Sequence, residues 1–210
     1  MRTLYLLVEG PGDRHAAPWL LRRLLHEEFQ CYNWLVDAKH VMEVGGLSKL
    51  RKRLSDYIEH LRGKPCDGAL ILLDLEDLLP CEEGPALAEE IAALRPLPFP
   101  LAVVFAYREF ETWFLHSLSS IASQSPLFVD GAAYPGNPEG KRNAKKELEV
   151  RMPPLVKYNP MLHQAELTKL LDFAQARRSP SFQRLERALT ELLTAVDTEA
   201  GAGFISPRKK

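Results

Sequence analysis

The sequence predicts an α/β fold with a mostly parallel central sheet, helices on its faces and a C-terminal helical extension. Two observations lead to this fold class. Short apolar runs alternate with segments in which apolar residues recur every three or four positions, as in successive βαβ units. The runs also carry no charge until they end, which is typical of strands buried in a parallel sheet. At 210 residues and 46% hydrophobic, the chain can form one sizeable core.

The first elements are a strand, a helix and a weaker strand. Residues 3–8 form an apolar run that ends at the turn-forming segment 10–12. Asp13 then precedes a helical pattern that extends to about Phe29. Residues 33–44 predict the second strand, which two glycines close.

The following elements continue the alternation as far as residue 118. In chain order we expect a helix at 47–61, a strand at 68–73, a Pro/Gly loop at 80–85, a helix at 86–94, a strand at 101–106 and a helix at 109–118.

The pattern changes after residue 120. Residues 121–160 are rich in Gly, Pro, Asn and Lys and show little periodicity, whereas 161–176 and 180–197 predict two helices. The last ten residues are expected to be frayed. We therefore divide the chain into an α/β domain, 1–120, and a second part, 121–210, with an irregular basic loop and helices that pack on the same core.

Composition excludes several classes of protein. The net charge of −1 argues against binding of nucleic acid through overall basic charge, so such binding would need a local basic stripe. Three scattered cysteines predict neither a disulfide framework nor a zinc site. The apolar start is too short for a signal peptide or a membrane span, and a reducing cytoplasm fits best.

Carboxylates follow three of the predicted strands. They are Glu9 with Asp13, Asp74 with Glu76, and Glu111. Because parallel strands end at one edge of a sheet, these groups are expected to share a crevice. Two negative charges ~4 Å apart repel by roughly 4 kcal/mol at an effective dielectric constant near 20. A hard divalent cation held by oxygen ligands would offset this repulsion, so the pattern predicts a metal site.

Each carboxylate also has a simpler interpretation. Asp13 could serve only as the N-cap of the first helix. Asp74 and Glu76 could mark a strand end that enters solvent. Glu111, and Glu109 two residues before it, could complement the dipole of the helix that they begin.

Four segments resemble known families. VEGPGD is similar to the glutamate-glycine strand end of TOPRIM domains, particularly that of the overcoming-lysogenization-defect nucleases, and LLDLED resembles their Asp-x-Asp motif. The order of VEGPGD, LLDLEDLLPC, REFETWFL and KYNPMLHQAELTKLLDFAQARRSPSFQRL resembles a bacterial family catalogued as a domain of unknown function (number 4276) and placed among TOPRIM-like proteins.

The resemblance implies a TOPRIM-like, Rossmann-like sheet and roles for individual residues. Glu9 would act in proton transfer or contact a metal, Asp74 and Glu76 would hold Mg²⁺ or Mn²⁺, and Asp13 would match a further acid of the nuclease branch. Glu76 departs from the pattern, because aspartate is typical there.

These observations predict a metal-dependent TOPRIM-type nuclease that cleaves phosphodiester bonds with two ions ~3.5–4 Å apart. Glu9 and Lys157 are the expected catalytic residues, and Glu111 is expected to assist in metal binding. Lys141, Arg142, Lys145 and Lys146 would bind nucleic acid, although such a cluster can also be a solvated surface.

The resemblance also implies an ATPase partner and a role in anti-phage defence. The alternative is a non-catalytic TOPRIM-like subunit of an ATPase complex. A phosphatase on a related sheet is disfavoured, because the first strand lacks a DxDxT-like motif. The oligomeric state stays open.

Overall fold

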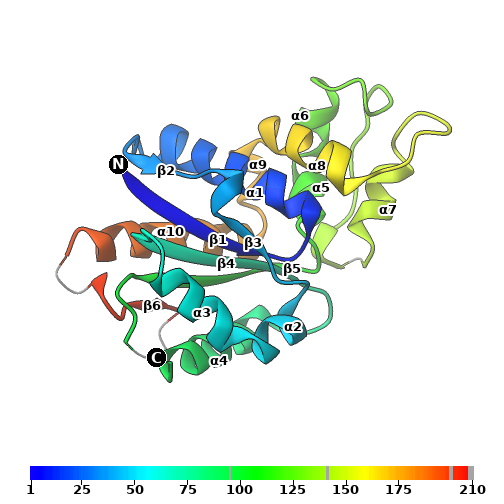
Figure 1. Ribbon diagram of the computed structural model, residues 1–210. Helices are drawn as coiled ribbons and strands as arrows, with labels where there is room; N and C mark the ends of the chain where they lie inside the picture. Colours follow the sequence, from blue (N-terminus) through cyan, green and yellow to red (C-terminus); the bar gives the residue numbers. More distant parts are fainter. Residues whose placement is uncertain (95, 141, 199–200, 208–210) are drawn as a thin grey trace.

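A parallel sheet of six strands forms the centre of the protein. The computed structural model describes residues 1–94, 96–140, 142–198 and 201–207 (Figure 1). The strands are β1 (Arg2–Val8), β2 (Trp34–Leu35), β3 (Val41–Glu43), β4 (Gly68–Leu75), β5 (Leu101–Tyr107) and β6 (Ile205–Ser206). Their order is β2-β1-β4-β5-β6, with β3 also paired to β1, and each of these pairs is parallel. The predicted α/β class is confirmed.

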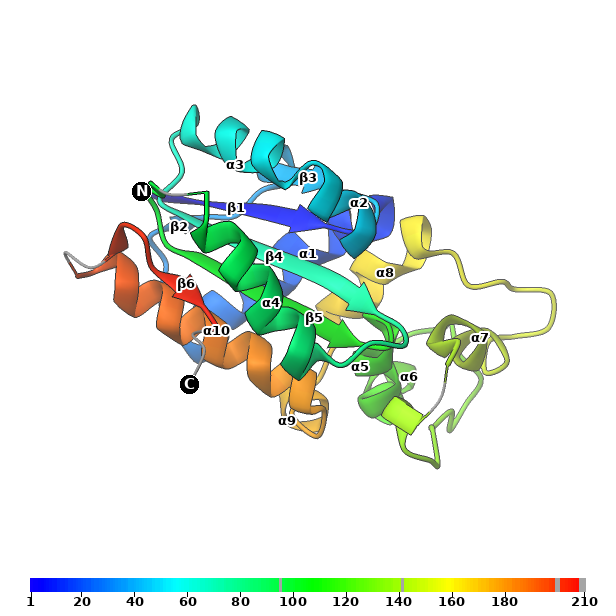
Figure 2. The same ribbon diagram turned by 90° about the horizontal axis from the view of Figure 1, so that it is seen from below.

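Alternate side chains of the strands pack on two layers of helices. Leu6 and its neighbours on one face contact α1 (Pro11–Arg23) and α10 (Pro180–Val196). Leu7 and its neighbours on the other face contact α3 (Leu54–Arg62) and α4 (Pro80–Ala92). Figure 2 shows the sheet from the side of α4. The core on the first of these faces therefore joins helices from the first and last parts of the chain to the sheet.

The helices between β5 and α10 gather mainly beyond the carboxyl ends of the central strands (Figure 1). They are α5 (Glu111–His116), α6 (Leu118–Ala122), the 3₁₀ turn η3 (Pro138–Gly140), α7 (Ala144–Glu149), α8 (Pro160–Lys169) and α9 (Phe173–Ala176). None of the helices in the described ranges has both the length and the apolar character needed to cross a membrane.

Helix α8 packs closely against α1, and Gly12 permits this approach. A Cβ atom built on Gly12 would lie 2.2 Å from Oε1 of Gln164 and 2.7 Å from Cβ of Pro160. These separations are too short for any other residue unless the helices part. The glycine after the first strand therefore brings the C-terminal region to the edge of the sheet.

Several predicted boundaries in the first half were wrong. The first helix begins at Pro11 rather than after Asp13, and it continues as the π-helix η1 (Leu24–Glu28). The predicted strand 33–44 is divided into β2 and β3 by the 3₁₀ turn η2 (Ala38–His40). The segment 80–85 is not a loop, because Pro80 begins α4. Proline is tolerated at this position, since the first N–H groups of a helix have no hydrogen-bond partner within the helix.

Three long predicted helices are divided in the structure. The pattern at 47–61 forms α2 (Leu47–Lys52) and α3, because Arg53 takes a non-helical backbone at φ −125° and ψ 20°. The pattern at 109–118 forms α5 and α6, and the pattern at 161–176 forms α8 and α9. The spacing of apolar residues continues across such breaks in a helix, so the sequence alone does not reveal them.

The second part of the chain is more ordered than predicted. The irregular segment 121–160 contains α7, and the tail expected to be frayed contributes β6. Ile205 and Ser206 are buried, and the amide of Leu101 donates a hydrogen bond to the carbonyl of Phe204 at 2.9 Å. The tail therefore covers an edge of the sheet that would otherwise expose unpaired backbone groups.

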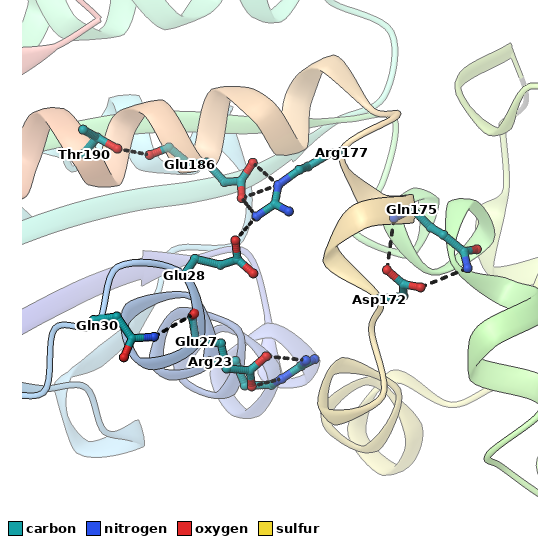
Figure 3. A network of polar contacts seen from close by, with 9 residues as sticks. All are labelled: Arg23, Glu27, Glu28, Gln30, Asp172, Gln175, Arg177, Glu186 and Thr190. Atoms are coloured by element: carbon teal, nitrogen blue, oxygen red, sulfur yellow. Dashed lines mark hydrogen bonds and ion pairs between the residues drawn. The ribbon is translucent and has the colours of Figure 1, made fainter.

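An arginine connects the N-terminal and C-terminal helices (Figure 3). The Nη2 atom of Arg177, which follows α9, lies 2.7 Å from Oε1 of Glu186 in α10 and also pairs with Glu28 in η1. One guanidinium group thus joins α10 to η1, which is far away in the sequence. The contact helps to fix α10 and η1 on the same face of the sheet.

Candidate functional site

The sheet brings three predicted carboxylates to its carboxyl edge. Glu9 directly follows β1, Asp74 is the penultimate residue of β4, and Glu111 begins α5 just after β5. Parallel pairing aligns these strand ends, since Val8 lies opposite Leu72 and Asp74 lies opposite Ala106. The apolar runs therefore end where the carboxylates begin, which is the arrangement expected from the sequence.

Asp13 joins this edge from the first turn of α1. Gly10 is the N-cap, so the N-cap role considered for Asp13 was wrong. The backbone amide of Gly10 donates a hydrogen bond to Oδ2 of Asp13 at 3.1 Å. Gln164 of α8 donates through Nε2 to Oδ1 at 2.6 Å. Asp13 is thus held at both oxygens, from its own helix and from the C-terminal region.

Asp74 and Glu111 are fixed by neighbouring donors. The amide of Phe110 donates to Oδ1 of Asp74 at 2.8 Å, so the turn after β5 orients this carboxylate. Glu111 is 1% exposed, and its Oε1 accepts a hydrogen bond from the hydroxyl of Tyr158 at 3.0 Å. Hydrogen bonds from neighbouring elements of the fold therefore fix the orientation of both carboxylates.

The ammonium group of Lys145 lies among these carboxylates. Its Nζ atom is 3.1 Å from Oε2 of Glu111, 3.2 Å from Oε2 of Glu109 and 3.8 Å from Oδ2 of Asp74. Its backbone amide also donates to Oε2 of Glu109 at 3.3 Å. Helix α7 therefore supplies one positive charge to an edge that carries several negative ones.

The pKa values show that the carboxylates are electrostatically linked. Burial raises the pKa of each of four groups, Glu9, Asp13, Asp74 and Glu111. The charges of neighbouring carboxylates raise these pKa values further, and Lys145 lowers them. Burial alone would lower the pKa of Lys145, but Glu111, Asp74 and Glu109 hold it above its ordinary value. One ammonium thus only partly offsets the repulsion within this group, which we call the carboxylate cluster.

Two other predicted site residues lie further out. Glu76 is exposed beyond the end of β4, although its charge still raises the pKa of Glu9. Lys157 is exposed, and its charge acts on Glu149. The lysine that meets the carboxylate cluster is Lys145, which the sequence had suggested only for nucleic-acid binding.

The predicted basic stripe is largely engaged in ion pairs. Nη2 of Arg142 lies 2.6 Å from Oδ1 of Asp77, and Lys146 pairs with Glu149 one turn along α7. Lys141 lies outside the described residues. The stripe is thus interspersed with acids and does not form a uniformly positive surface in the described part of the chain.

The donor chemistry of the cluster fits a hard divalent cation, because all of its candidate ligands are carboxylate oxygens. Oε2 of Glu111 is buried and accepts no hydrogen bond of good geometry, although Lys145 lies beside it as an ion-pair partner. Among the described residues, no three His, Cys, Asp or Glu side chains already converge as metal ligands. A bound cation would therefore require the carboxylates to draw together and Lys145 to withdraw.

Three residues at the site were not identified from the sequence. Gln164 holds Asp13, Tyr158 holds Glu111, and Arg108 follows β5 with its guanidinium bonded to the carbonyl of Glu76 at 2.5 Å. Local sequence gives no signal for Gln164, since its contact joins residues 151 positions apart.

Comparison with known proteins gives a family and no function. No curated protein and no solved structure matches the chain. The family model described as Domain of unknown function (DUF4276) matches residues 8–190, a span that includes Glu9, Asp74, Lys145 and Gln164. Since this span is most of the sequence, the chain belongs to the family described as Domain of unknown function (DUF4276).

Proposed function

We propose that this chain is a TOPRIM-like nuclease that requires Mg²⁺ or Mn²⁺ and cleaves phosphodiester bonds. The observation that carries the proposal is the position of Lys145, whose ammonium lies 3.1 to 3.8 Å from three carboxylates at the carboxyl edge of the sheet. A cationic group is already held where the sequence predicted a metal ion. The crevice outside the carboxyl ends of parallel strands is also a common place for phosphate chemistry.

Asp13, Asp74 and Glu111 would hold the metal. When bound, divalent ions polarise a phosphoryl oxygen and lower the pKa of an attacking water molecule. Glu9 stands at the end of β1, where burial and then the charge of Asp13 raise its pKa above the ordinary value, so it is a stronger base than a free carboxylate and is suited to accept a proton or to contact the metal. Glu76, the exposed residue that follows β4, would contribute from the rim of the site.

Lys145 would change partners in such a reaction. When its carboxylate partners are engaged elsewhere, its ammonium is free to pair with a phosphate oxygen of the substrate. This assigns to Lys145 the catalytic role first considered for Lys157. Nucleic acid is the proposed partner, and an ATPase partner and anti-phage defence rest on the TOPRIM resemblance alone.

A non-catalytic interaction subunit is the alternative, and one observation favours it. Lys145 already satisfies part of the negative charge, as expected of a cluster that has become purely structural. The two functions differ in a direct test, because a structural cluster predicts no cleavage and no dependence on Asp74.

The test is incubation of the pure protein with labelled single-stranded and double-stranded DNA and RNA in Mg²⁺, Mn²⁺ or EDTA. Cleavage is expected with metal and not with EDTA. Asp74→Asn should reduce the rate about 100-fold or more, because it removes a metal-binding charge from the site. Glu82→Gln, at an exposed position in α4, is the control and should keep full activity. Absence of cleavage of every substrate with either metal would contradict the nuclease and favour the structural alternative.

A further inference from the structure

A small cavity of about 210 Å³ lies beside the carboxylate cluster. It is lined by Glu76, Arg108, Glu109, Arg142 and Asn143. The cavity adjoins the cluster through Glu109, whose carboxylate shares Lys145 with Glu111. The sequence had associated only Arg142 with nucleic acid.

Two guanidinium groups at this cavity hold one carboxylate between them. Oδ1 of Asp77 lies 3.3 Å from Nη1 of Arg108 and 2.6 Å from Nη2 of Arg142. Arginine pairs strongly with carboxylates and with phosphates, because its planar donors match two oxygens of either group. Asp77 thus occupies a position that suits the oxygens of a phosphodiester.

The backbone at the cavity is also unusual. Arg108 has φ of 70° and Asn143 has φ of 63°, so two non-glycine residues of the same cavity adopt the left-handed region. Such conformations cost free energy and persist where the surrounding structure requires them, often at binding sites. Arg108 is held there by hydrogen bonds to the carbonyls of Glu76 and Glu139. Its guanidinium is therefore positioned before any ligand arrives.

The acids that line the cavity do not exclude an anion. Glu109 is 7% exposed and is paired with Lys145, while Glu76 extends into solvent. Asp77 is 51% exposed, so its side chain can leave the two arginines without crossing the core. Withdrawal of Asp77 would remove the carboxylate that these two guanidinium groups share.

We propose that Arg108 and Arg142 bind a backbone phosphate of the nucleic-acid strand, next to the phosphate at the carboxylate cluster, and that Asp77 occupies this site until the strand displaces it. The assignment rests on the proposed function, because a strand phosphate is expected here only if the cluster receives its neighbour. Beyond the proposed nuclease, the inference adds a site that positions the nucleic-acid strand and a carboxylate, that of Asp77, that competes with the strand for this site.

The test measures binding in EDTA, so that cleavage does not interfere. The full chain is titrated against a fluorescent single-stranded oligonucleotide, with inorganic phosphate as a separate probe. Arg142→Gln, at a side chain that is 71% exposed, should weaken oligonucleotide binding about tenfold and lower the salt slope by about one. Asp77→Asn should tighten binding several-fold, because it removes the competing carboxylate.

Arg53 and Asp56 provide matched controls, since they form a similar exposed pair 3.3 Å apart at the start of α3 and do not line this cavity. Arg53→Gln and Asp56→Asn change the net charge equally and should alter binding much less. Equal effects of Asp77→Asn and Asp56→Asn, or of Arg142→Gln and Arg53→Gln, would overturn the inference. If the Arg142→Gln and Asp77→Asn substitutions change the binding of inorganic phosphate but not that of the oligonucleotide, the assignment to a nucleic-acid strand is overturned. If the substitutions at Arg142 and Asp77 change oligonucleotide binding more than the controls do, but the protein cleaves no substrate, the nuclease hypothesis is refuted and the phosphate-binding site is retained.

Discussion

The Nζ atom of Lys145 lies 3.1 Å from Oε2 of Glu111, a side chain that is 1% exposed. This contact joins α7, from the segment expected to be irregular, to the first residue of α5 beside the sheet. It places a positive charge at the innermost carboxylate of the cluster. The stability and the cation affinity of the edge should therefore both depend on Lys145.

Replacement of Lys145 by Gln should destabilise the protein at pH 7.5, because Glu111 and Glu109 would lose their cationic partner. A fully buried pair broken in this way costs roughly 3–5 kcal/mol. The side chain of Lys145 is 42% exposed, so screening by solvent reduces the expected loss to about 1–2 kcal/mol. Urea unfolding measures this loss. Lys146→Gln, at the next residue, removes only an exposed pair with Glu149 and should cost much less; equal losses would refute a special role for Lys145.

The sequence was sufficient to predict the ends of β1, β4 and β5 to within two residues. Leu70 to Leu73 and Val103 to Phe105 are buried runs, and the charges that follow them mark the carboxyl edge. The position of Asp74 then follows from parallel pairing, which is a property of the whole topology. The position of Glu111 also depends on the turn between β5 and α5. Strand β6 was missed because two residues are too few to produce a periodic pattern.

The partners of the carboxylates could not be predicted in the same way. Lys145 and Lys157 are the same residue type, so the sequence alone does not distinguish them, and only the path of the chain between α5 and α8 decides which one reaches Glu111. That path depends on packing between distant segments, such as the approach of α8 to Gly12. Gln164 became a partner of Asp13 through this packing, for which no local pattern exists.

Replacement of Asp74 by Asn should stabilise the protein at neutral pH. Burial, and then the charges of Asp13 and Glu111, raise the pKa of Asp74 above its ordinary value of 3.8. The folded protein therefore holds this proton to a higher pH than the unfolded chain does. The stability contributed by the group is complete below about pH 3.8 and is lost as pH rises through the raised pKa. Asn avoids this loss and keeps an oxygen that can accept from Phe110.

The measurement is the unfolding temperature of Asp74→Asn and wild type between pH 4 and pH 8. The variant should melt higher by a few degrees at pH 7.5, on the order of 2–4 °C per kcal/mol for a chain of this size, and the difference should shrink toward pH 4. Asp37→Asn is the control of opposite sign, since a hydrogen bond from the amide of Lys39 lowers the pKa of Asp37. A variant of Asp74 less stable than wild type at pH 7.5 would contradict the argument.

Mn²⁺ should stabilise the wild-type protein against heat in a saturable manner. A ligand at 100 times its dissociation constant raises the free energy of unfolding by about 2.7 kcal/mol when it binds only the folded state. Glu9→Gln and Asp74→Asn should reduce this stabilisation, whereas Glu82→Gln should not. Lys145→Gln should bind Mn²⁺ more tightly, because no ammonium would compete for the carboxylates. Equal Mn²⁺ responses in all these variants would argue against a metal site at this edge.

Replacement of Tyr158 by Phe should leave a buried oxygen of Glu111 without a hydrogen-bond donor. Tyr158 is 9% exposed, and its hydroxyl lies 3.0 Å from Oε1 of Glu111. Loss of a hydrogen bond to a charged buried group costs about 1.5–3 kcal/mol, which urea unfolding at pH 7.5 would detect. Tyr32→Phe is the matched control, because that hydroxyl bonds to Gln30 at an exposed position. Equal and small losses in the two variants would show that the contact with Glu111 is unimportant.

Replacement of Gln164 by Glu tests whether α8 is part of the site. Gln164 is 2% exposed, and its Nε2 donates to Oδ1 of Asp13 at 2.6 Å, so Glu would place a second carboxylate against the first without changing the size of the side chain. The variant should lose about 2 kcal/mol or more at pH 7.5 through repulsion and the lost donor. Stability should recover as pH falls, because the pair then takes up a proton.

Gln175→Glu separates this effect from ordinary repulsion between like charges. Gln175 donates to Oδ2 of Asp172 at 3.0 Å, away from the carboxylate cluster (Figure 3). Both variants should be destabilised at pH 7.5, but Mn²⁺ should restore stability only to Gln164→Glu, because only there would the added carboxylate join oxygens that bind a cation. Equal rescue by Mn²⁺ in both variants, or rescue in neither, would place α8 outside the cation-binding edge and leave Gln164 with a purely structural contact to Asp13.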